Sequence, residues 1–232
     1  ACQLAAFNLY LKARSRAESE GADDFELPDI GIVCADAKVA DVEAATEVFD
    51  EVAADQPDVR DTLEQILEEF QDIHGLGSLL DVKGTLSEDF LREQTKITDS
   101  WSGPRSLTAF LKQLHEAVGE HHDDDSFLAQ DLRSFLRLLV VLSQEYDVAL
   151  MNPPYGARNR MPDDVTDYVE EHYEYGPEYY INFFEVCDNL TKENGRVGMI
   201  VQRSFMFKSS FQDFREDFIG KLGVFDFLAE YG

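Results

Sequence analysis

Residues 146–155 read YDVALMNPPY, an apolar run that ends in a turn with two consecutive prolines. Residues 146–151 have the short apolar pattern of a buried β-strand. Pro153 and Pro154 end such a strand and stiffen the turn after it, because proline fixes φ and has no N–H to donate. We therefore expect a strand followed directly by a rigid turn, at the carboxyl end where open α/β sheets collect their ligands.

Downstream of this turn, helical and strand patterns alternate. The order strand, helix, strand, helix, strand is typical of an α/β fold. The expected elements are a polar loop over 158–167, a helix over 177–190, a strand over 196–202 after the Asn194-Gly195 turn, a helix over 209–221 and a strand over 224–228.

Upstream of the turn, helical patterns dominate. The expected elements are a helix over 2–16, a buried strand over 30–36, three or four helices in the next hundred residues with starts at Pro57 and Pro104 and a stop at Gly75, and a well-buried helix over 126–145. We therefore expect three parts. Residues 1–40 and 126–232 form the α/β core, and residues 41–125 form a large α-helical insertion.

The charge of the chain is strongly negative, with 47 acidic and 20 basic residues and a formal net charge of −27. At ordinary salt such a chain would repel nucleic acid. Acidic residues on every polar face and few lysines resemble the proteins of extreme halophiles, and in molar salt the Debye length falls to about 3 Å. We therefore interpret the acidity as a sign of habitat and not of a partner.

Several classes of protein are excluded by the composition. No run approaches the roughly 20 apolar residues that span a bilayer, and no secretory signal is recognisable. The three cysteines are widely spaced, which favours buried free thiols in a reducing cytoplasm. The histidines and acids between His115 and Asp125 lack the spacing of a zinc site, so we expect a solvated loop there and no metal.

The tetrapeptide Asn152-Pro153-Pro154-Tyr155 resembles the catalytic motif of the gamma-type N6-adenine DNA methyltransferases. Segments 3–7, 12–14, 196–202 and 204–211 are similar to PglX-type methylases of BREX phage-defence systems and to type IIG restriction-modification methylases. The resemblance implies a partial Rossmann-like class I methyltransferase sheet, S-adenosylmethionine as cofactor and double-stranded DNA as partner.

The chemistry of this motif suits an exocyclic adenine amine, a poor nucleophile whose lone pair is delocalised into the ring. Two rigid hydrogen-bond acceptors against its two protons pull the nitrogen toward tetrahedral geometry. Asn152 can offer its amide oxygen and Pro153 its carbonyl, while Tyr155 can stack on an extruded base. The alternative is that the tetrapeptide is only a rigid surface turn.

Further roles follow from the resemblance alone. Asp36 would accept from the adenine amine of S-adenosylmethionine, and Phe183 would line the cofactor pocket. The structural alternative for Asp36 is a helix cap or a solvated strand end. The structural alternative for Phe183 is a core phenylalanine. A last group comprises basic residues that would face DNA or be ordinary surface charges: Arg158, Arg160, Arg203 and Lys208.

The chain departs from the family in one respect, because it contains no glycine-rich cofactor motif. We expect that motif before residue 1, so that this chain alone would be inactive and would need the remainder of the same protein or other defence-system subunits. The enzymatic alternative is a protein-glutamine or rRNA-guanine methyltransferase. The non-enzymatic one is an acidic interaction protein or a methylase remnant.

Overall fold

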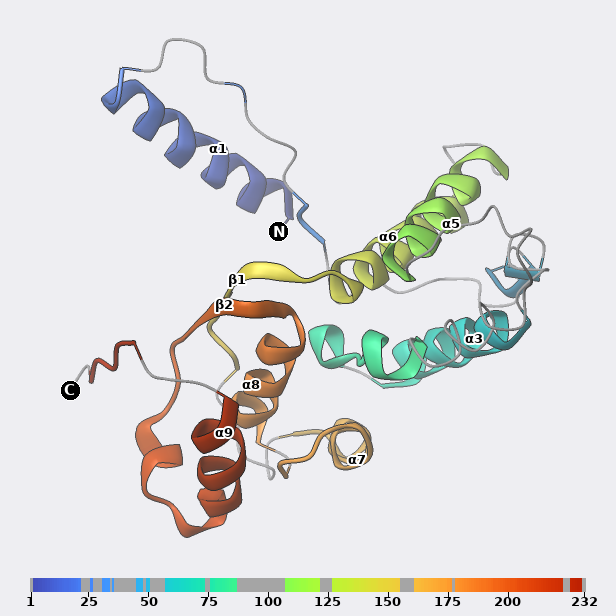
Figure 1. Ribbon diagram of the computed structural model, residues 1–232. Coiled ribbons are helices and arrows are strands. Elements are labelled where there is room, and N and C mark those ends of the chain that lie inside the picture. The colour runs from blue at the N-terminus through green and yellow to red at the C-terminus, as the bar shows by residue number, and fades with distance from the viewer. Residues whose placement is uncertain are drawn as a thin grey trace.

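The computed structural model describes residues 2–21, 26, 31–33, 35, 45–47, 49–50, 57–73, 76–86, 107–121, 127–154, 161–176, 178–222 and 226–230. The elements, drawn in Figure 1, are α1 (Cys2–Ser19), α3 (Pro57–Asp72), η1 (Gly77–Leu79), α5 (Leu107–His121), α6 (Phe127–Ser143), β1 (Tyr146–Met151), α7 (Asp163–His172), α8 (Tyr179–Asn189), β2 (Thr191–Met199), η3 (Arg203–Met206), η4 (Ser209–Phe211), η5 (Phe214–Ile219) and α9 (Gly220–Leu222).

A parallel pair of strands, β1 and β2, forms the sheet of the described part, and α8 connects them. Val148 lies opposite Arg196 and Met151 opposite Met199, but the register shifts between Tyr146 and Val148. Asn194, whose φ of 64° is left-handed, lies in the stretch of β2 where this shift occurs.

The two faces of the sheet differ in burial. Met151 and Met199 pack against the main core, whereas Val148 and Leu150 are 53% and 79% exposed. Successive side chains of a strand point to opposite faces, so one face is covered and the other is open. Helix α1 stands clear of the other elements in Figure 1 and carries further exposed apolar residues, among them Phe7.

The main core lies among the helices and joins both halves of the chain. Helices α5 and α6 lie side by side, and Phe70 of α3 packs against Phe135 of α6 with ring centroids 5.3 Å apart. The same core includes Val165 of α7 and Phe183 of α8. Residues 41–125 therefore share a core with residues 126–232, and the expected division into three parts stays a prediction.

A smaller cluster of aromatic residues lies at the C-terminal end, and we call it the aromatic cluster. Phe214 of η5 is 1% exposed and stacks on Phe218 at 5.2 Å, with Tyr175 edge-on to both rings. The other members are Tyr180, Ile181, Phe184, Val201, Phe205, Phe211 and Ile219. This cluster packs η3, η4 and η5 onto α8.

Several expected elements are confirmed. The helices over 2–16, 126–145 and 177–190 correspond to α1, α6 and α8, and Pro57 does begin α3. The helix expected over 209–221 is present, but as η4, η5 and α9 with a π-helical middle. Pro104 and Gly75 lie outside the described residues.

Other expectations need correction. The polar loop over 158–167 is wrong from Asp163 onward, where α7 begins, because Val165, Tyr168 and Val169 form a buried helical face. Strand β2 begins at Thr191 and not at 196, since pairing with β1 extends the ladder through the Asn194-Gly195 turn.

Two expected strands are not found where the structure describes them. Asp226, Phe227 and Leu228 are in no strand, and neither are Gly31, Ile32 and Val33. A strand needs a hydrogen-bonded neighbour, and none of the described segments pairs with either stretch. Ala35 is in a turn, and the other residues of these stretches, Asp36 included, lie outside the described part.

Candidate active site at the carboxyl end of the sheet

The carboxyl ends of β1 and β2 lie side by side, which places the chain segments that follow them at one edge. The pairing continues past β2, because the Ile200 N–H donates to the Met151 carbonyl at 3.1 Å. Asn152, the next residue after Met151, is exposed, whereas Pro153 is buried. The turn is thus anchored through Pro153 and presents Asn152 at the edge of the sheet.

The segment after β2 is a second structured loop at this edge, formed by η3 and η4, and we call residues 203–211 the 203–211 loop. Phe205 and Phe211 anchor it in the aromatic cluster, with 4% and 8% of their surface exposed. Tyr180, fully buried at the start of α8, shares a hydrogen bond of 2.9 Å with the Ser204 hydroxyl. The loop is therefore tied to the helix that connects the two strands.

Arg215 closes the 203–211 loop from the other side. Its Nη1 donates to the carbonyl of Phe205 at 2.8 Å and to the carbonyl of Lys208 at 2.7 Å. One guanidinium nitrogen thereby bridges two successive turns of the backbone. The geometry fixes the residues between these carbonyls, Met206 and Phe207.

Two of the four candidate DNA-binding cations are described, and both belong to the 203–211 loop. The Nζ of Lys208 lies 5.4 Å from the centroid of the Phe211 ring. Arg203 is exposed and forms an ion pair with Glu230. Arg158 and Arg160 lie outside the described residues, so their roles stay predictions.

The two candidate cofactor residues are not brought together by the described structure. Phe183 is 5% exposed and packs in the main core. Asp36 lies outside the described residues, as does Tyr155 of the tetrapeptide. Contact of Phe183 with a cofactor therefore stays a prediction, beside the core position that the structure gives this ring.

The charge at this edge departs from that of the chain as a whole. Residues 148–162 and 194–212 follow the two strands or include their ends, and these 34 residues contain no Asp or Glu. At the chain average of 47 acids in 232 residues they would hold about seven. They do contain five basic residues: Arg158, Arg160, Arg196, Arg203 and Lys208.

The connection between α7 and α8 is held by polar groups on α8. The Asn182 side chain donates to the Tyr175 carbonyl at 2.9 Å and accepts from the Glu178 N–H at 3.2 Å. The Glu185 carboxylate accepts from the Glu174 N–H at 2.9 Å. Burial raises the pKa of Glu185 to about 7, although these hydrogen bonds favour the charged form.

Among the described residues of this edge, no cysteine or histidine side chain is placed for catalysis. Cys187 is a buried free thiol, as expected, and burial raises its pKa to about 11. Across the described stretches, no three His, Cys, Asp or Glu side chains are placed to hold a metal ion. Those stretches also contain no helix both long and apolar enough to cross a bilayer.

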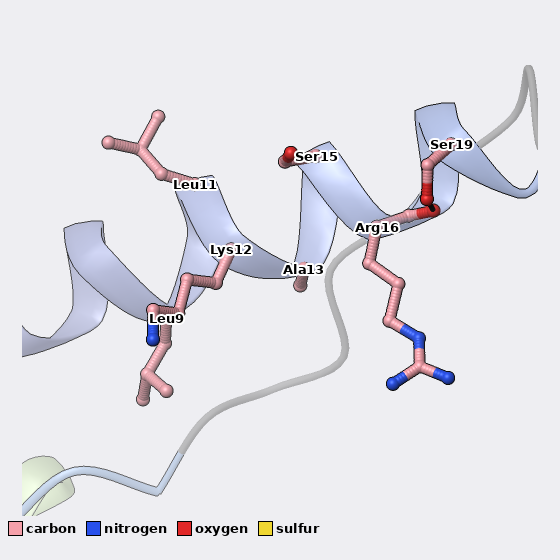
Figure 2. A pocket seen from close by; sticks show the side chains of 7 residues that line it. All are labelled: Leu9, Leu11, Lys12, Ala13, Ser15, Arg16 and Ser19. Atoms are coloured by element: carbon pink, nitrogen blue, oxygen red, sulfur yellow. Dashed lines mark hydrogen bonds between the residues drawn. The ribbon is translucent and has the colours of Figure 1, made fainter.

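A surface hollow of about 690 Å³ lies elsewhere, along α1. Figure 2 shows that its lining side chains, from Leu9 to Ser19, project from both sides of one helix. Such a hollow is open to solvent and contains none of the candidate site residues. We therefore place the candidate site at the carboxyl edge of the sheet and not beside α1.

Four residues that support the site were not predicted from the sequence, namely Tyr180, Asn182, Glu185 and Arg215. Asn182 could have been found, because a polar residue inside the apolar run YYINFF must satisfy its hydrogen bonds when buried. Nothing in the sequence separates Arg215 from a surface arginine, since its partners are backbone carbonyls.

The geometry described so far is a unit of strand, helix and parallel strand, with an Asn-Pro-Pro turn after the first strand. The model of the Eco57I restriction-modification methylase family matches residues 1–224. The chain belongs to this family, and so to the methyltransferases of the restriction-modification type.

Two curated relatives are adenine-specific methyltransferases. The chain is 37% identical over 87 residues to PglX of Lacticaseibacillus casei (strain Zhang), which covers 37% of this chain and 7% of that protein. It is 27% identical over 111 residues to BrxX of Escherichia coli O9:H4 (strain HS), covering 47% of this chain and 9% of that protein. The matched stretches thus span less than a tenth of either relative.

Proposed function

We propose that this chain is the catalytic region of a site-specific DNA adenine-N6 methyltransferase of a restriction-modification or phage-defence system. The observation that carries the proposal is the Asn-Pro-Pro turn at the carboxyl end of β1, beside the end of β2, in a chain of the Eco57I family. The adenine specificity of PglX and BrxX supports the choice of base.

The proposed chemistry uses hydrogen-bond acceptors and no ionisable base. The Asn152 amide oxygen and the Pro153 carbonyl accept the two N6 protons of the extruded adenine, which concentrates the lone pair on nitrogen. N6 would then attack the methyl carbon of a bound donor, the bond from that carbon to the sulfonium sulfur would break with its electron pair left on sulfur as a neutral thioether, and N6 would release one proton to solvent. Buried Pro153 supports this role, because an anchored turn holds its acceptors in place before the base arrives.

S-adenosylmethionine is the proposed methyl donor, and it supplies a methyl group activated by a sulfonium charge. Asp36 and Phe183 are the residues of this chain that we propose to contact it. The same proposal includes a Rossmann-like sheet that completes such a site. Its core would be formed by residues 1–40 and 126–232, with residues 41–125 as an insertion.

Double-stranded DNA is the proposed substrate, with Arg158, Arg160, Arg203 and Lys208 facing its phosphates. The acid-free segments 148–162 and 194–212 support this orientation, since acids at the edge would repel the duplex. In the molar salt of a halophilic cytoplasm the repulsion by the rest of the chain would be screened, and so would the attraction between these four cations and the phosphates.

A noncatalytic role is the second candidate, because a net charge of −27 also suits an acidic protein that binds a basic partner. The two candidates differ in one measurement. The complete protein encoded by the gene in which this chain occurs is incubated at molar salt with labelled S-adenosylmethionine and, in parallel reactions, with duplex DNA, with rRNA or with a protein substrate, and the labelled nucleosides or residues are separated.

N6-methyladenine in that DNA is the expected product. Label on protein glutamine or on rRNA guanine instead would replace the proposal by those activities. A folded protein that binds no S-adenosylmethionine and labels no substrate would leave the interaction protein or methylase remnant as the function.

A further inference from the structure

Two neighbouring apolar side chains project from the 203–211 loop. Phe207 is 66% exposed and Met206 is 47% exposed. Their neighbours in the loop behave differently, because Phe205 and Phe211 are buried in the aromatic cluster. The loop thus places two of its four large apolar side chains inside and two in water.

The exposure of Phe207 is built into the fold of the loop. The Phe207 and Lys208 N–H groups both donate to the Ser204 carbonyl, at 3.3 and 3.0 Å. Arg215 binds the carbonyls on either side of the Met206-Phe207 pair, those of Phe205 and Lys208. These bonds hold Phe207 outward before any partner arrives, so its ordering costs little on binding.

The charge around Phe207 suits a polyanion. The loop lies in the acid-free segment 194–212, and Phe207 stands between Arg203 and Lys208. Two acids approach these cations, since Glu230 pairs with Arg203 and Glu178 interacts electrostatically with Lys208. The protruding apolar pair is therefore flanked in the sequence by two cations, in a chain whose net charge is −27.

We propose that Phe207, backed by Met206, is a wedge that enters the duplex and fills the space left by the extruded adenine. This inference rests on the proposed function and adds to it the group that opens the base stack. A buried base must leave the stack before its amine can reach Asn152, which costs a few kcal/mol of unstacking and unpairing. Apolar side chains inserted between base steps offset such costs in proteins that deform DNA.

The position of the loop suits two separate roles, reception of the base by Asn152 and filling of the gap by Phe207. Asn152 and the 203–211 loop follow adjacent parallel strands, so both lie at the carboxyl edge of the sheet. Asn152 then receives the base, while Phe207 holds the gap and Lys208 and Arg203 hold the flanking phosphates.

The test compares Phe207→Ala with Phe7→Ala in the complete protein encoded by the gene. Phe7 is a matched control, because it is 56% exposed and lies on α1, remote from the loop. The recognition site is first read from the positions of N6-methyladenine in DNA methylated by the wild-type protein. Single-turnover methyl transfer is then measured on two duplexes, with the target adenine opposite thymine or opposite an abasic site.

The wedge predicts that Phe207→Ala slows transfer to the paired adenine by about ten- to a hundredfold. On the abasic duplex, where the adenine is already unpaired, it predicts a rate within about twofold of the wild type. With 2-aminopurine at the target position, the fluorescence rise on binding should be lost in Phe207→Ala on the paired duplex. Phe7→Ala should match the wild type throughout.

Three results would overturn the inference while the proposed function stands. They are an unchanged rate on the paired duplex, an equal loss on both duplexes as expected for a wall of the base pocket, and an equal loss in Phe7→Ala. Failure of the wild-type protein to methylate either duplex would overturn the proposed function and the wedge together.

Discussion

Arg215→Ala is expected to loosen the 203–211 loop without unfolding the rest of the protein. The substitution removes the guanidinium nitrogen that donates to the carbonyls of Phe205 and Lys208. The side-chain anchors Phe205 and Phe211 remain buried in the aromatic cluster. The effect should therefore be confined to the backbone between them.

The magnitude follows from the different burial of the two hydrogen bonds. A hydrogen bond that involves a charged group contributes about 1.5–3 kcal/mol net, and the bond to Phe205 is partly buried. The bond to Lys208 is exposed, so that water replaces the donor and the loss is about 0.5–1 kcal/mol. The opening free energy of the loop should fall by about 2–4 kcal/mol in total.

Amide hydrogen exchange measures this directly, because local opening sets the exchange rate of the Phe207 and Lys208 amides. A loss of about 2–4 kcal/mol corresponds to exchange that is about 30- to 900-fold faster in peptides covering residues 203–211. Arg14→Ala on α1, which removes an exposed ion pair with Glu18, should leave the loop unchanged. Unchanged protection in Arg215→Ala would refute the assignment of Arg215 as the clamp.

Two further predictions concern stability. Glu185→Gln should flatten the pH dependence of unfolding. The folded carboxyl, with a pKa of about 7 against an ordinary 4.5, holds its proton more tightly than the unfolded one, so wild-type stability falls as pH rises from about 4.5 to about 7. Because the carboxyl is partly exposed, solvent screening reduces this change in unfolding free energy to about 1–2 kcal/mol. Denaturant titrations at pH 5 and pH 8 measure it. The same change in the wild type and in Glu185→Gln would contradict the prediction. Phe135→Ala, at a fully buried position against Phe70, should cost about 3–5 kcal/mol in the same titration, whereas exposed Phe207→Ala should stay within about 0.5 kcal/mol.

The elements that the sequence predicted well are those with strong local patterns. The apolar face of α6 and the run of β1 are periodic and long enough to identify from one chain. The Asn-Pro-Pro turn was predictable for a different reason, because proline dictates its own backbone. Its position after β1 follows from chain order alone.

The elements that were missed depend on contacts between distant segments. Helix α7 was taken as a loop because its five acids conceal the Val165-Tyr168-Val169 face, which is apolar only toward the core. The early start of β2 depends on its pairing with β1 through a left-handed Asn194. Arg215 was invisible for a similar reason, since no local pattern marks an arginine that binds backbone carbonyls.

The charge of the chain shows how an average can conceal a site. A net charge of −27 argues against nucleic acid when it is read as a whole. The segments at the carboxyl edge have the opposite balance, with five basic residues and no acidic one in residues 148–162 and 194–212. The distribution of charge therefore supports a DNA substrate that the total opposes.

The central claim is that the Asn152 side chain activates an adenine amine, and Asn152→Ala in the complete protein tests it most directly. Methyl transfer to duplex DNA at molar salt should fall by about a hundred- to a thousandfold, as when an oxyanion-hole donor is removed. Asn189→Ala, a matched change at the exposed far end of α8, should leave the rate unchanged. Transfer to adenine that persists in Asn152→Ala at the rate of the Asn189→Ala control would contradict the account.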